Sequence, residues 1–221
     1  MTDSQTSDQA IEQTATASTT GKPVRRSQAD RRADTRQRIL QATLAQLMQS
    51  GYAGLTTQAV CKRAGVSKGA MFDHFPSKQA LIVAANEASN EHLRADALQT
   101  LTALVDAPDR LRATVDYLWK IYASPTVIAL TEVHMAARTD PALLAALDDV
   151  ADAHRDATLL LAQTLFPAKS TQQEFMRAVE VGLSAIMGGA VLFHTGSASA
   201  DTDAVLTFLT MLIRPYIEDQ Q

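Results

Sequence analysis

The stretch that decides the fold is TTQAVCKRAGVSKGAMFDHFPSK, residues 56–78. It holds two short apolar patterns separated by Gly65, and each pattern is too short to form a stable helix alone in water. Thr56 or Thr57 can cap the first helix and Ser67 the second, because their side chains accept hydrogen bonds from unpaired backbone amides. We therefore predict two short helices that pack against each other across a tight turn.

Two helices that cross steeply need a small side chain where they touch and a turn residue that tolerates positive φ. Cys61 and Gly65 meet these needs, and we expect Cys61 to be a small buried hydrophobe rather than a redox sensor. Lys68, Gly69 and Ala70 begin the second helix with cationic or small groups that let a backbone approach a groove floor. The stretch predicts a helix-turn-helix whose second helix enters the DNA major groove N-terminus first.

The residues before this stretch predict a helix and a tail. From Asp34 onward, Leu40, Leu44 and Leu47 recur at helical spacing, and Gly51 is expected to end that helix in a left-handed conformation. Residues 1–28 are rich in Ser, Thr, Gln and Ala without a helical period, and we predict a disordered tail. Four arginines close it as a basic arm, either a solvated linker or a contact to nucleic acid: Arg25, Arg26, Arg31 and Arg32.

Residues 35–81 resemble the DNA-binding domain of TetR-type transcriptional regulators, including the Gly51–Tyr52 break and the sequence FPSK at residues 75–78. The resemblance implies that the second short helix reads base edges and that its neighbours contact phosphates. Phe72 departs from the family pattern, which most often has a tyrosine whose hydroxyl bonds a phosphate. The DNA-binding residues it implies are Thr56, Thr57, Gln58, Lys68, Gly69, Ala70, Phe72, His74 and Lys78.

The rest of the chain predicts further helices and no strands, so the fold class is all-α. We expect helices after Ser77, near Pro108 with Asp106 ahead of it, after Pro125, and from Asp140-Pro141 to Leu165. A capping box at Ser170–Gln173 or Thr171–Glu174 predicts the next start, and Asp201 the last, with Pro215 fraying or ending that helix. The expected domains are a tail (1–28), a three-helix helix-turn-helix domain (29–80) and a larger helical ligand-binding and dimerisation domain (81–221).

The charge is divided between these segments. Residues 22–80 hold eleven Lys and Arg against three Asp, whereas residues 81–221 hold nine Lys and Arg against eighteen Asp and Glu. The net positive charge of residues 22–80 favours binding to a polyanion such as double-stranded DNA. The net negative charge of residues 81–221 disfavours contact with DNA, so we expect this segment to have a different function.

The acidic segment is expected to pair subunits and to bind an effector. Small and apolar residues on its last two helices predict a four-helix homodimer interface, or alternatively the subunit's own core: Gly182, Ala185, Ile186, Gly189, Phe193, Val205, Phe208, Leu209 and Leu212. Candidate contacts to a small, mainly apolar effector are Trp119, Tyr122, His134, Met135, Arg138 and Met187, although core packing or solvated faces explain them equally well.

Other functions find little support in the sequence. We expect no signal peptide, because residues 1–20 lack an apolar central stretch, and no membrane span, because the apolar runs are short. The single cysteine fits a cytoplasmic protein. No catalytic fingerprint or zinc-binding histidine pair occurs, so we expect no enzyme activity, cofactor or metal. We predict a homodimeric, ligand-responsive repressor that binds a palindromic operator. An activator, a protein-triggered regulator and a helical module without DNA function stay open as alternatives.

Overall fold

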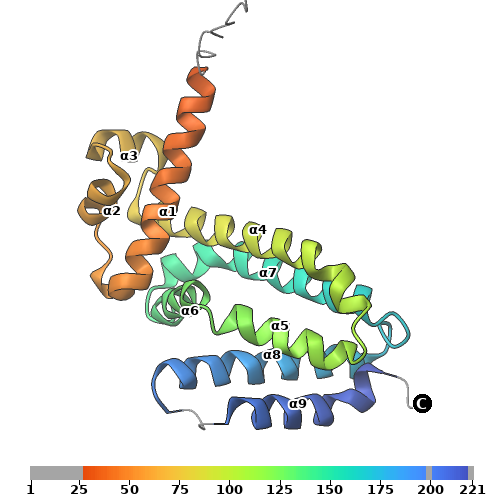
Figure 1. The fold of residues 1–221 in the computed structure, drawn as a ribbon. Helices are drawn as coiled ribbons and strands as arrows, with labels where there is room; N and C mark the ends of the chain where they lie inside the picture. Colours follow the sequence, from red (N-terminus) through yellow and green to blue (C-terminus); the bar gives the residue numbers. More distant parts are fainter. Residues whose placement is uncertain (1–26, 198–200, 219–221) are drawn as a thin grey trace, which may run out of the picture.

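The computed structural model describes residues 27–197 and 201–218 and confirms the all-α class (Figure 1). In these residues the helices are α1 (Gln28–Gly54), α2 (Thr57–Ala64), α3 (Lys68–His74), α4 (Lys78–Val105), α5 (Arg110–Tyr122), α6 (Pro125–Ala137), α7 (Pro141–Leu165), α8 (Gln173–His194) and α9 (Thr202–Ile217). In Figure 1, α2 and α3 lie beside α1 at one end of the molecule, and α8 and α9 form the layer at the other end.

The helix before the turn is longer than the sequence predicted. We expected helical periodicity from Asp34, but α1 begins at Gln28, because Ser27 and Asp30 form a reciprocal capping box. Arg31 and Arg32 therefore belong to the first turns of a helix rather than to an extended arm. Arg25 and Arg26 lie outside the described residues.

Gly51 has the predicted positive φ, of 67°, and its non-helical backbone interrupts the helix at the predicted position. A short further helical segment follows this kink as far as Gly54, and Leu55 is the C-cap. With ψ at −179°, Gly51 occupies a backbone region that is open almost only to glycine.

The two short helices form as the stretch predicted. The side chains of Thr56 and Ser67 accept hydrogen bonds from the amides of Ala59 and Ala70, at 3.2 and 3.1 Å. Gly65 ends α2 in the left-handed region, with φ at 65°. Local sequence therefore sets both boundaries of the turn.

Helix α4 joins the two ends of the molecule without interruption. Ser77 caps it, and its first half packs into a core with α1–α3, α6 and the start of α7. Leu104, near its C-terminal end, belongs to a second core with α5, α8 and α9. The predicted boundary at residue 80 falls inside this helix, and α4 contributes residues to both cores.

Helix α5 begins at Arg110, near Pro108 as predicted, with Asp109 as its N-cap. Two other predicted helix boundaries differ in the structure. Both predicted capping boxes before α8 are wrong, since Gln172 is its N-cap without a side-chain bond and Ser170 instead donates to the Pro167 carbonyl. Pro215 lies inside α9, where the buried side chain of Ile217 holds the final turn against the second core.

In the described part of the chain, α8 is the helix that is long and apolar enough to cross a membrane by length and composition. The sequence predicted no such segment. Phe175, Ala178, Ile186 and Ala190 bury one face of α8 in the second core, together with Gly182. Packing against α5 and α9 thus accounts for the apolar residues on that face.

Candidate nucleic-acid interface and effector cavities

The predicted DNA-binding residues of α3 form an exposed surface. Lys68, Gly69 and Phe72 are exposed, and Ala70 and His74 are half-buried. The opposite side of α3 is anchored by Met71, which has no exposed surface. A short helix fixed on one side by a buried anchor presents its N-terminal turn outward, as docking in a major groove requires.

The remaining predicted contacts lie at the starts of neighbouring helices. Thr56 and Gln58 are exposed, and Thr57 and Lys78 are half-buried. The Lys78 ammonium lies 5.1 Å from the centre of the Tyr52 ring. These positions place hydroxyl, amide and ammonium donors at two helix N-termini beside α3.

Phe72, which replaces the tyrosine that the family pattern favours, contacts Lys68. The Lys68 ammonium lies 5.8 Å from the centre of the Phe72 ring, within the range of a cation–π interaction. The ring therefore orients a cation on the exposed side of α3 although it cannot donate a hydrogen bond itself.

Arg31 and Arg32, predicted as part of a basic arm, lie on α1 beside α3, a placement that the sequence did not predict. Arg31, Arg32 and Thr35 line a groove of about 480 Å³ with Ala70 and His74 of α3. The capping box at Ser27 was the signal for this helical extension. It places two guanidinium groups, which suit phosphates, next to the exposed helix, in a groove that Asp73 also lines.

Cys61 is buried, as predicted, and takes part in the packing beneath α3. Its Sγ lies 3.6 Å from Sδ of Met71, and Val60 and Ala64 are buried in the same core. The Arg38 guanidinium donates to the Ala64 carbonyl at 3.1 Å, which ties the end of α2 to α1.

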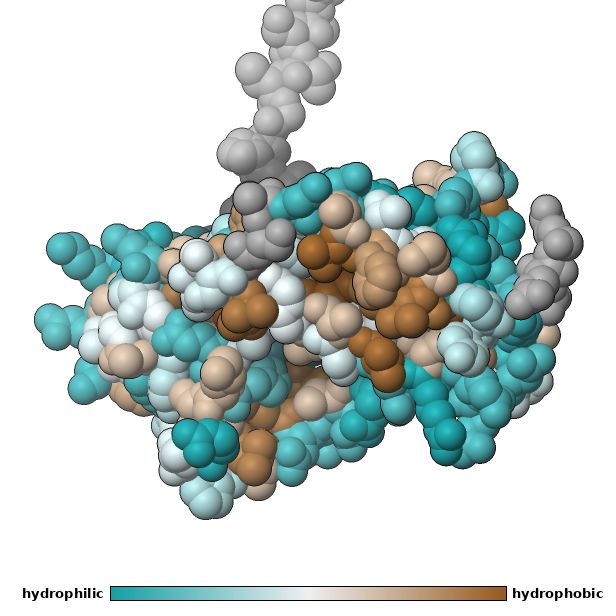
Figure 2. Space-filling view, turned by 90° about the horizontal axis from the view of Figure 1, so that it is seen from below, coloured by the Kyte–Doolittle hydropathy of each residue, from teal (hydrophilic) through white to brown (hydrophobic). Residues whose placement is uncertain are grey.

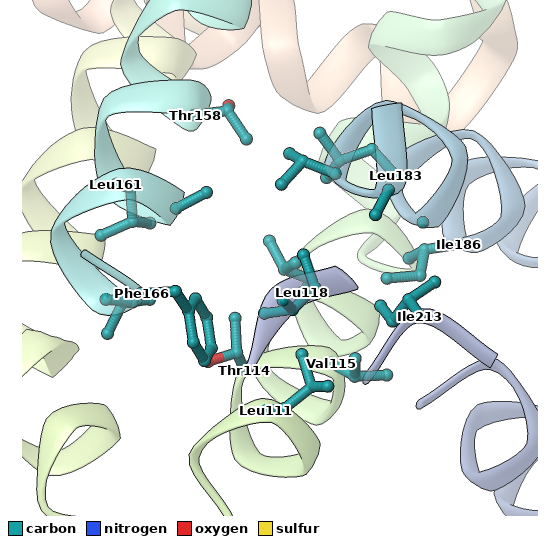
Figure 3. Close-up of a pocket in the computed structure, with 16 residues that line it drawn as sticks. Leu111, Thr114, Val115, Leu118, Thr158, Leu161, Phe166, Leu183, Ile186 and Ile213 are labelled. Atoms are coloured by element: carbon teal, nitrogen blue, oxygen red, sulfur yellow. The ribbon is translucent and has the colours of Figure 1, made fainter. Parts of the chain in front are cut away.

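Three adjoining cavities lie between the helices of the other end. The core cavity, of about 60 Å³, has side chains of α5, α7, α8 and α9 pointing into it (Figure 3). The middle cavity, of about 280 Å³, shares Leu118, Thr158 and Leu161 with it. The polar cavity, of about 240 Å³, shares Tyr122 and His154 with the middle cavity.

Tyr122 and His154 meet between the middle and polar cavities. The Tyr122 hydroxyl lies 3.2 Å from Nε2 of His154, although the residues are 32 positions apart in the chain. Burial lowers the pKa of His154, and electrostatic repulsion by the neighbouring Arg94 and His134 lowers it further. Burial also raises the pKa of Tyr122. Both side chains are therefore neutral hydrogen-bonding groups near pH 7.

Asn86 of α4 supplies the most unusual group of the polar cavity. Its side chain is 2% exposed, and its Nδ2 has no hydrogen-bond partner. An unsatisfied buried donor costs about 1–3 kcal/mol of stability. In the described residues it is the one buried side-chain nitrogen or oxygen left unpaired, so it calls for a functional explanation.

The structure brings together half of the predicted effector contacts. Tyr122, His134 and Met187 line the polar cavity. Trp119 instead packs against Phe193, with ring centres 5.9 Å apart. Met135, on α6, and Arg138, directly after it, are exposed and do not line the three cavities. Asn86 and His154 line the same cavity but were not among the predicted residues, because only the packing of α4 and α7 against α5 and α6 brings them there.

The predicted dimer residues divide between two faces of α8 and α9. Gly182, Ile186 and Leu209 are buried in the subunit's own core, and Trp119 covers Gly189. The outer face is apolar and exposed, and Figure 2 shows hydrophobic side chains gathering across this side of the molecule. We call this outer face the α8–α9 face; its exposed apolar residues are Val181, Ala185, Leu192, Phe193, Val205, Phe208, Met211, Leu212 and Tyr216.

Comparison with known proteins agrees with this arrangement. The family model described as "Bacterial regulatory proteins, tetR family" matches residues 39–85. The HTH-type transcriptional regulator Rv2912c of Mycobacterium tuberculosis is 32% identical over 168 residues, covering 76% of this chain and 86% of that protein. The HTH-type transcriptional regulator CymR of Pseudomonas putida is 32% identical over 121 residues, covering 55% of this chain and 60% of CymR.

Solved structures share the fold. The multidrug binding protein EbrR complexed with ethidium has a TM-score of 0.62 and 26% identity, covering 81% of this chain and 99% of that one. FadR of Bacillus subtilis in complex with stearoyl-CoA has a TM-score of 0.64 over 82% of this chain and 99% of that one, and its 11% identity shows the fold alone. The resemblance seen in residues 35–81 thus extends to both ends of the molecule: the chain belongs to the TetR family of helix-turn-helix transcriptional regulators, a family of DNA-binding proteins that are not enzymes.

Proposed function

We propose that this regulator is a homodimeric, cytoplasmic repressor that a small, mainly apolar effector releases from a palindromic operator. The observation that carries the proposal is the continuity of α4. Its first residue, Lys78, lies beside α3, and Asn86, Asn90 and Leu93 of the same helix line the polar cavity. An effector that displaces α4 therefore shifts the position of the DNA-reading helix.

The comparisons support repression rather than activation, and release by a small molecule. KstR of Rhodococcus jostii, named a transcriptional repressor, is 39% identical over 80 residues. EbrR is described as a multidrug binding protein. To move the operator-bound fraction from 99% to 1%, an effector must favour the released state by about 5.5 kcal/mol.

Pairing of subunits is supported by the α8–α9 face. Phe208, Met211 and Leu212 are each more than half exposed, and large contiguous apolar patches mark interaction sites. Two copies of α8 and α9 can form a four-helix interface. Such a dimer would hold its two α3 helices about 34–36 Å apart, one turn of DNA.

The test is footprinting of the DNA upstream of the protein's own gene, combined with transcription from that DNA in vitro. We expect one protected palindrome and a fall in transcription as protein is added. Loss of protection on addition of an effector, with recovery of transcription, supports the proposal. A rise in transcription on binding contradicts repression, and the absence of any protected site contradicts the DNA function.

A further inference from the structure

The polar cavity combines an unpaired donor with an absence of negative charge. Asn86 reaches it from α4, and its Nδ2 finds no partner within the described residues. No residue that lines the core, middle or polar cavity is Asp or Glu. Arg94, on the wall of the middle cavity, carries the one permanent side-chain charge among those lining residues.

Four of the other polar side chains around Asn86 already make hydrogen bonds, and Asn90 adds a second amide to the wall of the cavity. His134 uses Nδ1 to bond the Leu130 carbonyl at 2.9 Å, and Thr131 donates to the Val127 carbonyl at 2.9 Å. His154 and Tyr122 pair with each other. Asn86 thus supplies a fully buried donor that no group within the described residues satisfies, so a molecule in the cavity can supply its hydrogen bond.

The neighbouring volumes set the shape of the occupant. From the Tyr122–His154 pair, the middle cavity continues between aliphatic side chains that include Leu93, Leu118 and Leu161. The middle and polar cavities together reach the range of small-molecule sites, about 300–1,000 Å³. An occupant that fills both has an apolar body and one polar end.

We infer that the effector is an apolar molecule with one carbonyl or carboxylate group, whose oxygen accepts a hydrogen bond from Nδ2 of Asn86. This inference rests on the proposed function. The apolar body of the effector lies in the middle cavity. An ammonium at the same end is rejected, because it presents donors to a donor and finds no carboxylate in the walls.

The experiment measures binding to the full chain by calorimetry with three probes that differ at one end: 4-phenylbutyrate, 4-phenyl-2-butanone and 4-phenylbutylamine. We expect the acid and the ketone to bind at least tenfold more tightly than the amine. Asn86→Leu, which keeps the branched shape and removes the donor, is expected to weaken the acid and the ketone at least tenfold. The acid alone binding, with the ketone as weak as the amine, supports a carboxylate rather than a carbonyl.

Two controls separate this inference from effects on folding and from the proposed function. Thr210→Val removes a different buried polar group, a hydroxyl on α9 outside the three cavities, and is expected to leave probe affinity unchanged. The melting temperature of unliganded Asn86→Leu is expected to rise, since an unsatisfied group is removed, whereas a structural Asn86 would give a fall. Equal affinity for the three probes, unchanged affinity in Asn86→Leu, or no binding of acid and ketone at millimolar concentration overturns the inference. Footprinting with wild-type protein reports separately on the proposed function.

Discussion

The carboxylate of Glu132 accepts a hydrogen bond from the backbone amide of Tyr52, with Oε1 and N 2.9 Å apart. This bond joins α6 to the kink in α1, directly beside Gly51. Thr131 and His134, on the same helix, line the polar cavity. Helix α6 is therefore a second connection, besides α4, between the effector cavities and the helix-turn-helix.

Removing this connection is expected to cost little stability when done alone. Glu132 is exposed, so we expect Glu132→Ala to lower the free energy of unfolding by about 1 kcal/mol. Gly51→Ala is expected to cost about 1–3 kcal/mol, because its backbone region is strained for alanine.

The double variant tests whether the two residues interact. A Cβ on residue 51 would lie 2.6 Å from Oε1 of Glu132 and displace the carboxylate. Urea denaturation should therefore show Gly51→Ala costing less in the Glu132→Ala background than in wild type. If the costs of the two substitutions simply add, the Glu132 carboxylate does not interact with residue 51. Glu87→Ala, at an exposed position of α4, replaces Glu132→Ala in the control double variant.

The α8–α9 face gives a prediction on assembly. Phe208 is 61% exposed in the subunit, and Phe208→Asp is expected to weaken the dimer by at least about 2 kcal/mol, roughly 30-fold, without unfolding it. Sedimentation equilibrium measures this change. Met135→Asp, on the similarly exposed residue of α6, should leave the dimer intact. Equal association of wild type and Phe208→Asp would place the subunit contact elsewhere.

His154 makes stability depend on pH. Burial lowers its pKa in the folded protein below the ordinary 6.5, so the unfolded chain binds the proton more tightly. The free energy of unfolding is expected to fall as the pH drops below about 6.5, towards the folded-state pKa. His154→Gln should flatten that part of the curve, whereas His92→Gln, at an exposed position of α4, should not. A curve unchanged by His154→Gln would mean that the ring is not held neutral.

Lys78 is expected to contact a DNA phosphate. Replacing it with alanine should reduce the slope of log K against log salt by about 1 per subunit, because one fewer counterion is released at each half-site. Fluorescence anisotropy at several salt concentrations gives this slope. Lys120→Ala, on α5, is the matched control. A slope unaltered by Lys78→Ala would remove this residue from the interface.

The sequence was most informative where structure is local. The caps at Thr56, Ser67 and Ser77 and the turn at Gly65 depend on residues three or four positions away, so their chemistry is visible in the sequence. The predicted start of α8 was wrong because the Ser170 hydroxyl donates to the Pro167 carbonyl instead of accepting from the helix amides.

The effector cavities were harder to predict because they depend on distant helices. Tyr122 meets His154 only after α5 packs near α7. The spacing of apolar residues also did not predict which face of α8 is buried, because α8 carries apolar side chains on more than one face. Gly182 and Ile186 face the subunit's own core. The unpaired amide of Asn86 has no sequence signature at all.

Substitution of Gly69 tests most directly whether α3 enters a DNA groove. A Cβ at this position would meet only Ser67 Oγ, at 3.9 Å, so nothing within the subunit requires glycine there. Gly69→Gln is therefore expected to leave the melting temperature unchanged or slightly higher. Anisotropy titration of the footprinted operator should show at least about a tenfold loss of affinity, equal to about 1.4 kcal/mol. Wild-type affinity in a folded, dimeric Gly69→Gln protein would contradict the docking of α3 in the groove.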